Sequence, residues 1–207
     1  YWLSALVGTQ KTADGYSKLV KDSKTFFYTF PESVPVYSAA TEIAEGFTPF
    51  NDTQKQNAIA VLNYIETVTA LSFVQISGAL ETNTLLFALN TQEEGSYAYA
   101  YLPEIHPLGS DIYMAIHQTN ETMSVGTEGA LTLIHEIGHA LGLKHPHEEA
   151  DGLGEVSVLP VDEDSVANTV MSYEESTVEN YKFEFNHLDI AALHYIYGPN
   201  PNVRASD

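Results

Sequence analysis

The stretch HEIGHALGLKH, residues 135–145, constrains this chain more than any other. It holds three of the eight histidines, at spacings of four and six residues. On an α-helix, residues four apart lie on one face, about one turn apart. His135 and His139 are therefore predicted to direct two imidazoles toward one point. Glu136 is rotated from His135 by roughly 100°, so we expect its carboxylate to stand beside that point.

Gly142 explains how the third histidine can reach the other two. A helix continued to residue 145 would carry His145 beyond His139 and away from the shared point. Glycine permits the left-handed conformation that ends a helix, so the chain is expected to turn sharply at Gly142 and bring His145 back. Pro146 then restricts the direction in which the chain leaves. Three imidazoles leave a fourth position open, as in catalytic rather than structural zinc sites.

Chance and a plain buried helix are the alternatives to a metal site. Uniform residue statistics place a bare H-E-x-x-H in roughly one chain in forty of this length. The added glycine and third histidine make an accidental match much rarer, on the order of one in ten thousand. The residues around the motif are apolar on nearly every side, and burying His and Glu there without a ligand would cost several kcal/mol. The pattern therefore favours binding of Zn²⁺.

The composition excludes several classes of function. The chain has no cysteine, which excludes disulfides, a thiolate nucleophile and a cysteine zinc site. Its 28 acidic and 8 basic side chains give a formal charge of −20, which argues against binding of DNA or of an anionic membrane. Solubility, a saline medium and recruitment of hard cations all remain open as causes of the acidity. The acidic segment 148–164 could bind Ca²⁺ or could simply be a solvated surface. It lacks the regular spacing of a calcium loop, which favours the solvated surface.

The order of predicted elements indicates an α+β fold in which helices pack against a mixed, twisted sheet. β-Branched and aromatic content predicts five strands, at residues 25–35, 71–76, 84–89, 96–102 and 111–116.

Helices are predicted from apolar residues at helical spacing. The first covers residues 57–71, with a capping box of Thr53 and Gln56 and with Asn51, Asp52 or Thr53 as the N-cap. The second, at 127–143, carries the histidine motif. The last, at 187–197, follows the N-cap Asn186 and stops at Gly198.

HEIGHALGLKH matches the metzincin signature H-E-x-x-H-x-x-G-x-x-H in full, and nearly the whole chain resembles the serralysins, which are secreted bacterial zinc endopeptidases. TVMSY (169–173) resembles the Met-turn of that family, with Met171 as the turn residue beneath the metal and Tyr173 as an additional zinc ligand. The position of His147 is usually Gly in the family and that of Glu174 is usually Trp, which is expected to change the rim of the cleft. Other stretches resemble the serralysin catalytic domain in the same order: YTFP, AYAYLP, LIHEIGHALGLKHP, EDS before TVMSY, and LDIAALHYIYGPN.

The resemblance implies one metzincin protease domain over residues 1–207, with a cleft between an upper subdomain of about 1–145 and a lower one of about 146–207. No glycine-rich repeats of the calcium-binding RTX β-roll occur, so we expect a catalytic-domain fragment or a relative that lacks the roll. The resemblance also implies a secreted, extracellular monomer. Its expected partners are protein or peptide substrates, with a proteinaceous inhibitor left open, and neither nucleic acid nor membrane.

The expected reaction is hydrolysis of peptide bonds in extended protein substrates, with broad specificity. A zinc-activated water would attack the peptide carbonyl, and Glu136 as general base would pass the proton to the leaving amine. By the resemblance, Tyr173 would hydrogen-bond the oxyanion, a contact worth roughly 3 kcal/mol. The resemblance also assigns substrate pairing to an edge strand formed by Ala98, Tyr99, Ala100, Tyr101 and Leu102. The alternative is that this strand only closes the edge of the core.

Two other function classes stay open. A zinc-loaded module could bind protein without cutting it, although the presence of Glu136 argues against this. Zinc-dependent hydrolysis of a non-peptide substrate is the other, and an edge strand suited to peptide pairing argues against it. The remaining histidines show no ligand spacing and are expected in surface, loop or packing roles: His106, His117, His147, His187 and His194.

Overall fold

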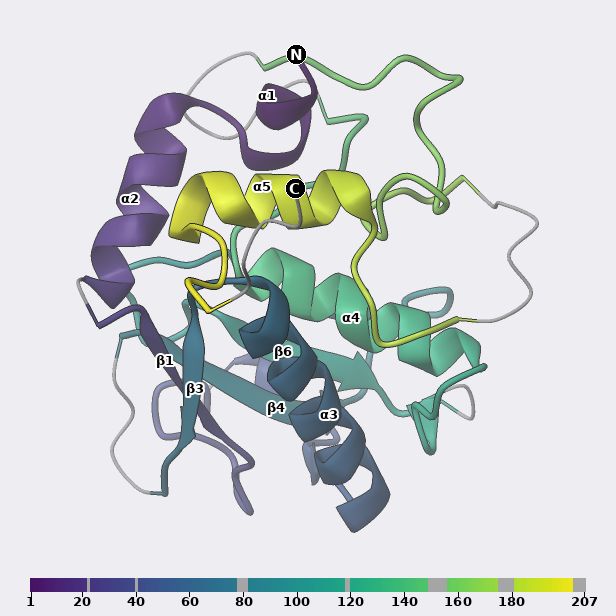
Figure 1. The fold of residues 1–207 in the computed structure, drawn as a ribbon. Helices are drawn as coiled ribbons and strands as arrows, with labels where there is room; N and C mark the ends of the chain where they lie inside the picture. Colours follow the sequence, from purple (N-terminus) through teal and green to yellow (C-terminus); the bar gives the residue numbers. More distant parts are fainter. Residues whose placement is uncertain are drawn as a thin grey trace.

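The computed structural model describes residues 1–21, 23–39, 41–77, 82–117, 120–148, 156–174 and 181–202. Within them a six-stranded sheet forms the centre of the molecule (Figure 1). The order is β3-β1-β4-β6-β5, and β2 pairs with β4. β1, β3, β4 and β6 pair in parallel, whereas β5 and β2 run antiparallel to their neighbours. The strands are β1 (Thr25–Thr29), β2 (Thr48–Pro49), β3 (Ser72–Gln75), β4 (Thr84–Asn90), β5 (Ala98–Ala100) and β6 (Asp111–Ala115).

The predicted mixed sheet is therefore present, but several strands are shorter than expected. The strand expected at 25–35 ends at Thr29, because Pro31 has no amide hydrogen to continue a ladder. The strand expected at 96–102 shrinks to three residues. After it, the Tyr101 amide still donates to the Asp111 carbonyl at 3.0 Å, before Pro103 interrupts the pattern. The two-residue strand β2 was not predicted.

The helices are α1 (Trp2–Val7), α2 (Gln10–Val20), α3 (Asp52–Val68), α4 (Glu128–Ala140) and α5 (His187–Tyr197), with a short 3₁₀ turn, η1 (Glu42–Ala44). The predictions did not include α1 and α2, whereas α5 has the predicted bounds. The capping box predicted at Thr53 and Gln56 is wrong. The Gln54 amide donates to the Asn51 side chain at 2.9 Å, and the Asn51 amide donates to the Gln54 side chain at 2.7 Å, because α3 begins directly after Asn51. None of the helices in the described residues combines the length and the hydrophobicity that a bilayer crossing requires.

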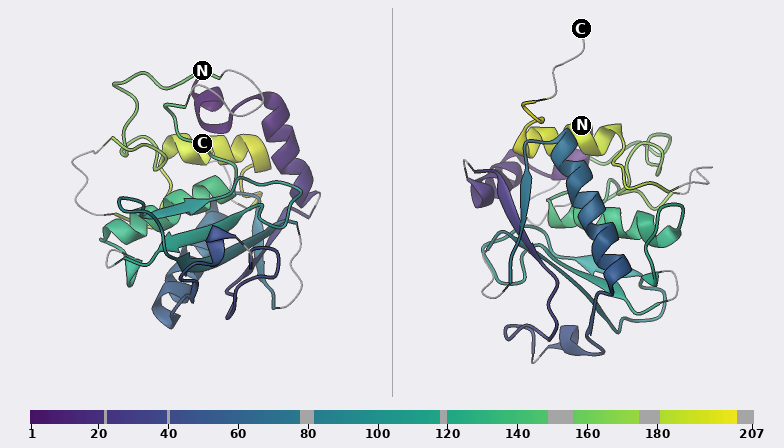
Figure 2. Two further views of the ribbon diagram at one scale, coloured as in Figure 1. Left: turned by 180° about the vertical axis from the view of Figure 1, so that it is seen from behind. Right: turned by 60° about the horizontal axis from the view of Figure 1, so that its bottom comes forward.

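The sheet has two unlike faces, since successive strand residues point to opposite sides. On one face, Leu85 and Phe87 of β4 join the main core with residues of α3, α4 and α5. On the other, Leu86 of β4 and Tyr113 of β6 form a smaller cluster with Ile43. Figure 1 shows α3 and α4 on the first face, and the view from behind in Figure 2 shows loops near the second. α4 thus lies on the helical face, beside the edge strand β5.

Candidate active site

Helix α4 holds the first two histidines on a buried support. Its N-cap Thr127 accepts a hydrogen bond from the Ala130 amide at 3.3 Å. Leu133, Ile134 and Ile137 are fully buried, so the helix cannot rotate without exposing its apolar face. This burial fixes the direction of the neighbouring side chains on the helix, which include His135 and His139.

Gly142 ends α4 as the sequence predicts. Its φ of +100° lies in the left-handed region. Its amide donates to the His139 carbonyl at 2.8 Å, and the Leu143 amide donates to the Gly138 carbonyl at 2.9 Å, which is the Schellman pattern. A Cβ at position 142 would also lie 2.4 Å from the ring of Tyr16. Both backbone conformation and space therefore require glycine at this turn.

The turn brings the three histidines together. The Nε2 atom of His145 lies 3.2 Å from that of His135 and 3.0 Å from that of His139. One ring nitrogen from each residue falls within a mutual distance of 4.8 Å. In the part of the chain that the structure describes, no other group of three His or carboxylate side chains converges in this way.

Hydrogen bonds on the far side of each ring fix how the three imidazoles are oriented. The Nδ1 atom of His135 lies 2.7 Å from the Val170 carbonyl, and that of His139 lies 2.8 Å from the Leu143 carbonyl. The Nδ1 atom of His145 lies 2.7 Å from the Glu148 carboxylate. Because these partners are acceptors, each Nδ1 carries the proton and each Nε2 presents a lone pair. Such outer partners set the tautomer of metal-ligating histidines.

This arrangement fits a bound Zn²⁺. Burial lowers the pKa of His135 to about 4 and lowers the pKa values of His139 and His145 as well, so all three rings stay neutral near neutral pH. Three lone pairs that converge at this distance repel one another unless a cation lies between them. Neutral imidazoles are also the ligands that zinc accepts most readily in a site without cysteine.

Met171 lies directly beneath the histidine helix. Its side chain is fully buried, and a Cβ at Gly138 would lie 2.6 Å from its sulfur. Gly138 stands between the two helical histidines, so the close approach of the methionine depends on glycine there. The sequence prediction placed Met171 correctly as a packing residue but did not single out Gly138.

Asp189 lies in the first turn of α5, and its carboxylate contacts more than the start of that helix. It accepts hydrogen bonds from the Thr169 hydroxyl at 2.5 Å, the Val170 amide at 2.9 Å and the Asn186 amide at 2.9 Å. Burial raises its pKa to about 7. The Val170 carbonyl in turn accepts from His135. Asp189 therefore connects α5 to the segment that orients the first histidine, a role without a signal in its local sequence.

Tyr173 places its hydroxyl at the histidine cluster. The oxygen lies 2.7 Å from the Nε2 of His145, and the ring stacks on His135 with a centroid distance of 5.7 Å. Burial, followed by the negative charges of Glu136 and Glu148, raises the pKa of Tyr173. The residue is nevertheless 64% exposed, so one side of the ring faces solvent. The structure thus brings Tyr173 to the expected position, while its role as a ligand stays a prediction.

His147 is the main departure from the family pattern near the site. Its ring lies parallel to that of His145, with centroids 5.3 Å apart, and 5.2 Å from the ring of Tyr173. Its Nδ1 faces the Asp164 carboxylate at 3.6 Å. His147 therefore lies in a loop, as predicted, and packs against the outer side of the cluster.

Glu136 is buried beside the cluster and has unused hydrogen-bonding capacity. It is 5% exposed, and its Oε2 has no hydrogen-bond partner among the residues that the structure describes. Burial raises its pKa to about 8, a shift that the charge of a bound cation would oppose. Glu136, His135 and Tyr173 line one cavity of about 590 Å³. A buried carboxylate facing such a cavity is placed to exchange a proton with a bound molecule.

The edge strand β5 also borders this cavity, through Ala98. β5 is at the end of the strand order and pairs with β6 alone, so the predicted edge position is confirmed for residues 98–100. The Tyr99 hydroxyl accepts a hydrogen bond from the Asn90 side chain at 2.8 Å, which directs that ring away from the histidines. Tyr101 and Leu102 follow the strand. Pairing of β5 with a substrate stays a prediction.

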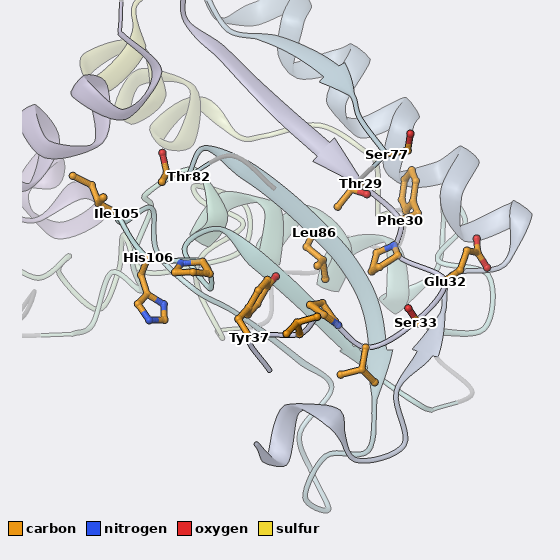
Figure 3. A pocket seen from close by; sticks show the side chains of 15 residues that line it. Thr29, Phe30, Glu32, Ser33, Tyr37, Ser77, Thr82, Leu86, Ile105 and His106 are labelled. Carbon is orange, nitrogen blue, oxygen red and sulfur yellow. The ribbon is translucent and has the colours of Figure 1, made fainter. Parts of the chain in front are cut away.

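A second cavity, of about 670 Å³, lies on the opposite face of the sheet. In Figure 3, Tyr37 and Leu86 lie between Phe30 on one side and His106 on the other. The Tyr37 hydroxyl donates to Asp111 at 2.8 Å, and the His106 Nδ1 accepts from a backbone amide. Although it is slightly larger, this cavity contains no convergent ligand set among the described residues.

Two of the other histidines make packing or hydrogen-bond contacts away from the cluster, whereas His106 and His187 are exposed. His117 contacts the Tyr97 ring edge-on, and the His194 Nε2 donates to the Val68 carbonyl at 2.6 Å. The acidic segment 148–164, for which Ca²⁺ binding was left open, includes residues 149–155, which lie outside the described residues. Calcium binding there therefore stays a prediction. The division into two subdomains also stays a prediction.

Comparison with known proteins gives the site a family. The chain is 35% identical to a serralysin of Photorhabdus luminescens over 209 residues, which is 94% of this chain and 41% of the relative. It is 32% identical to a serralysin of Proteus mirabilis, over 76% of this chain and 37% of the relative. It is 28% identical to the metallopeptidase AprA of Pseudomonas marginalis, over 87% of this chain and 41% of the relative. No family profile matches the chain.

The chain thus spans about two fifths of the length of the relatives it matches. Its similarity to them extends over most of its own length, and the structure brings together the three histidines of its H-E-x-x-H-x-x-G-x-x-H motif. The chain therefore belongs to the serralysin-type metzincins.

Proposed function

We propose that this chain is the catalytic domain of a zinc-dependent endopeptidase. The observation that carries the proposal is the convergence of three neutral imidazoles beside a buried carboxylate, whose Oε2 has no partner among the described residues and which lines the adjoining cavity together with His135. The printed names of its relatives, serralysin and metallopeptidase, support the same activity. Secretion, a monomeric state, broad specificity and control by a protein inhibitor belong to this proposal through the family resemblance alone.

His135, His139 and His145 would hold the zinc through their Nε2 atoms, with the Tyr173 hydroxyl as a further ligand close to His145. Bound there, zinc would supply Lewis acidity, which polarises a peptide carbonyl and makes a nearby water more acidic.

Glu136 would act as the general base. Its free Oε2 would take one proton from the attacking water as the water oxygen bonds to the carbonyl carbon. The same carboxyl would then give the proton to the amide nitrogen as the C–N bond breaks, so that Glu136 returns to its starting state. Because the surrounding helix is buried, few other waters would compete for that proton.

Tyr173 would stabilise the oxyanion formed by this attack. Its exposed ring can move, and its hydroxyl can donate a hydrogen bond to the negative oxygen. Donors of this kind contribute roughly 3 kcal/mol to the transition state. The substrate would lie extended along β5, where the unpaired edge offers backbone donors and acceptors.

A test combines Glu136→Gln with chelation. We expect casein cleavage by the zinc-loaded protein, loss of cleavage on chelation, and recovery when Zn²⁺ is restored. Glu136→Gln should keep its zinc, measured by atomic absorption, and lose about 10²–10⁴-fold in rate. Zinc binding without any cleavage by the native chain would instead favour the non-cutting binding module. Unchanged cleavage by Glu136→Gln would refute the role of this carboxylate.

A further inference from the structure

The cavity beside the histidines extends well beyond the reacting groups. One face of α4 lines it, through Glu128, Leu131, Thr132, His135 and Glu136. These positions follow the spacing of a single helical stripe. Since an α-helix rises 1.5 Å per residue, Glu128 lies about 12 Å along the axis from Glu136. The cavity therefore joins the candidate catalytic carboxylate to a second carboxylate two turns away.

The wall between these two carboxylates is largely apolar. It includes Tyr97, Leu131, Val166, Val170 and Tyr181. No lysine or arginine is among the described residues that line the cavity. A long side chain entering from the catalytic end would thus run along hydrocarbon and aromatic surface before it reached a negative charge.

Among the described residues, neither carboxyl group has a positively charged partner. The Glu128 side chain is exposed at the first turn of α4, and within the described ranges no hydrogen bond or ion pair involves its oxygens. The Oε2 atom of Glu136 is buried and likewise without a partner in the described residues. The whole chain carries a formal charge of −20, so the surrounding field also favours positive ligands.

We propose that this cavity selects substrates with a lysine or arginine close to the cut bond, with Glu128 as the specificity-determining residue. The proposal rests on the endopeptidase function proposed above. The aliphatic stem of such a side chain packs on the apolar wall, while its charged end reaches Glu128. Because Glu128 is exposed, the charge pair gives a bias of about twofold to fivefold rather than strict selection.

The experiment uses the zinc-loaded chain and a peptide set in which Arg, Leu or Glu occupies each position flanking the cut bond in turn. The variants are Glu128→Gln and Glu128→Lys. Asp52→Lys is a matched control, because Asp52 is also an exposed acidic residue in the first turn of a helix, α3, and does not line the cavity. For each combination of protein variant and peptide we measure kcat/KM at low and high ionic strength. Binding of the labelled peptides is measured by fluorescence anisotropy.

At one of the flanking positions we expect kcat/KM for the Arg peptide to exceed that for the Glu peptide by about fivefold at low salt, and by a smaller ratio at high salt. Glu128→Gln should remove most of this preference, Glu128→Lys should reverse it, and Asp52→Lys should leave it intact. The proposal is overturned if the native chain shows no cationic preference, or if Glu128→Lys retains it. Failure of the native chain to cleave any peptide would reject the endopeptidase function itself, and the anisotropy ratios of Arg to Glu peptides would still decide the charge selection.

Discussion

The two cavities on opposite faces of the sheet have similar sizes and opposite chemistry. Beside α4, three imidazole nitrogens converge on one point, and the Glu136 Oε2 at the adjoining cavity has no hydrogen-bond partner among the described residues. In the cavity behind β4, two of the lining polar side chains have protein partners: Tyr37 donates to Asp111, and Glu32 pairs with Lys55 at 2.9 Å. Volume alone would have favoured the second. Unsatisfied, convergent polar groups distinguish a site built for a ligand from a cavity that is merely open.

The strongest test of this contrast substitutes one histidine of the converging cluster and one histidine that lines the second cavity. His139→Ala should weaken zinc binding by more than the 10–100-fold that loss of an outer-shell partner causes, because it removes a ligand itself. His106→Ala should leave zinc affinity unchanged, since His106 lines only the second cavity. Competition with a chromophoric chelator measures both. Equal affinities in the two variants would remove the basis for a metal site on α4.

A smaller effect is expected when one tyrosine of each region, Tyr173 or Tyr37, loses its hydroxyl. Tyr173→Phe should keep zinc and reduce turnover by about 100-fold, through loss of one oxyanion donor. Tyr37→Phe should leave turnover unchanged and lower the free energy of unfolding by about 1–3 kcal/mol, because the buried Asp111 loses a hydrogen bond. Steady-state kinetics and urea unfolding separate the two outcomes. If Tyr173→Phe loses its zinc instead, the hydroxyl is mainly a structural ligand.

A further effect concerns pH, to which the stability contributions of the two regions should respond with opposite sign in metal-free protein. Burial raises the pKa of Asp111 to about 8 from its ordinary 3.8, so the folded state keeps a proton that the unfolded state has lost. Its contribution to stability should therefore fall as pH rises from about 4 to 8, by no more than about 1.4 kcal/mol per pH unit. Burial lowers the pKa of His135 to about 4 from 6.5, so its contribution should fall as pH decreases from 6.5 to 4.

Asp111→Asn isolates the first of these contributions. The difference in unfolding free energy between this variant and the native chain should change in the variant's favour as pH rises from 4 to 8. Urea unfolding with a chelator present provides the measurement. A difference that stays constant over this range would mean that Asp111 ionises at its ordinary pKa despite its burial.

Particular residues show how far the sequence could predict the structure. The bounds of α5 and the turn at Gly142 were predicted correctly, because each depends on local signals: a cap residue, a glycine and helical spacing. The capping box of α3 was placed two residues late, since Asn51 and Thr53 are both acceptable caps and only the packed helix selects one. Helices α1 and α2 were missed, because their short or weakly apolar sequences form helix against α5, which lies far along the chain.

The sequence by itself determined the ligand types, their spacing and the turn that returns the third histidine, because these follow from the helical repeat and from the conformational freedom of glycine. Tertiary structure decided which nitrogen of each ring faces the shared point, since the partners at Val170 and Glu148 come from outside the helix. It also decided that Met171 packs against Gly138 and that Asp189 holds the segment carrying Val170. In the same way, it placed Glu128 and apolar residues from distant segments along one cavity. These contacts join segments far apart in sequence, and no local propensity encodes them.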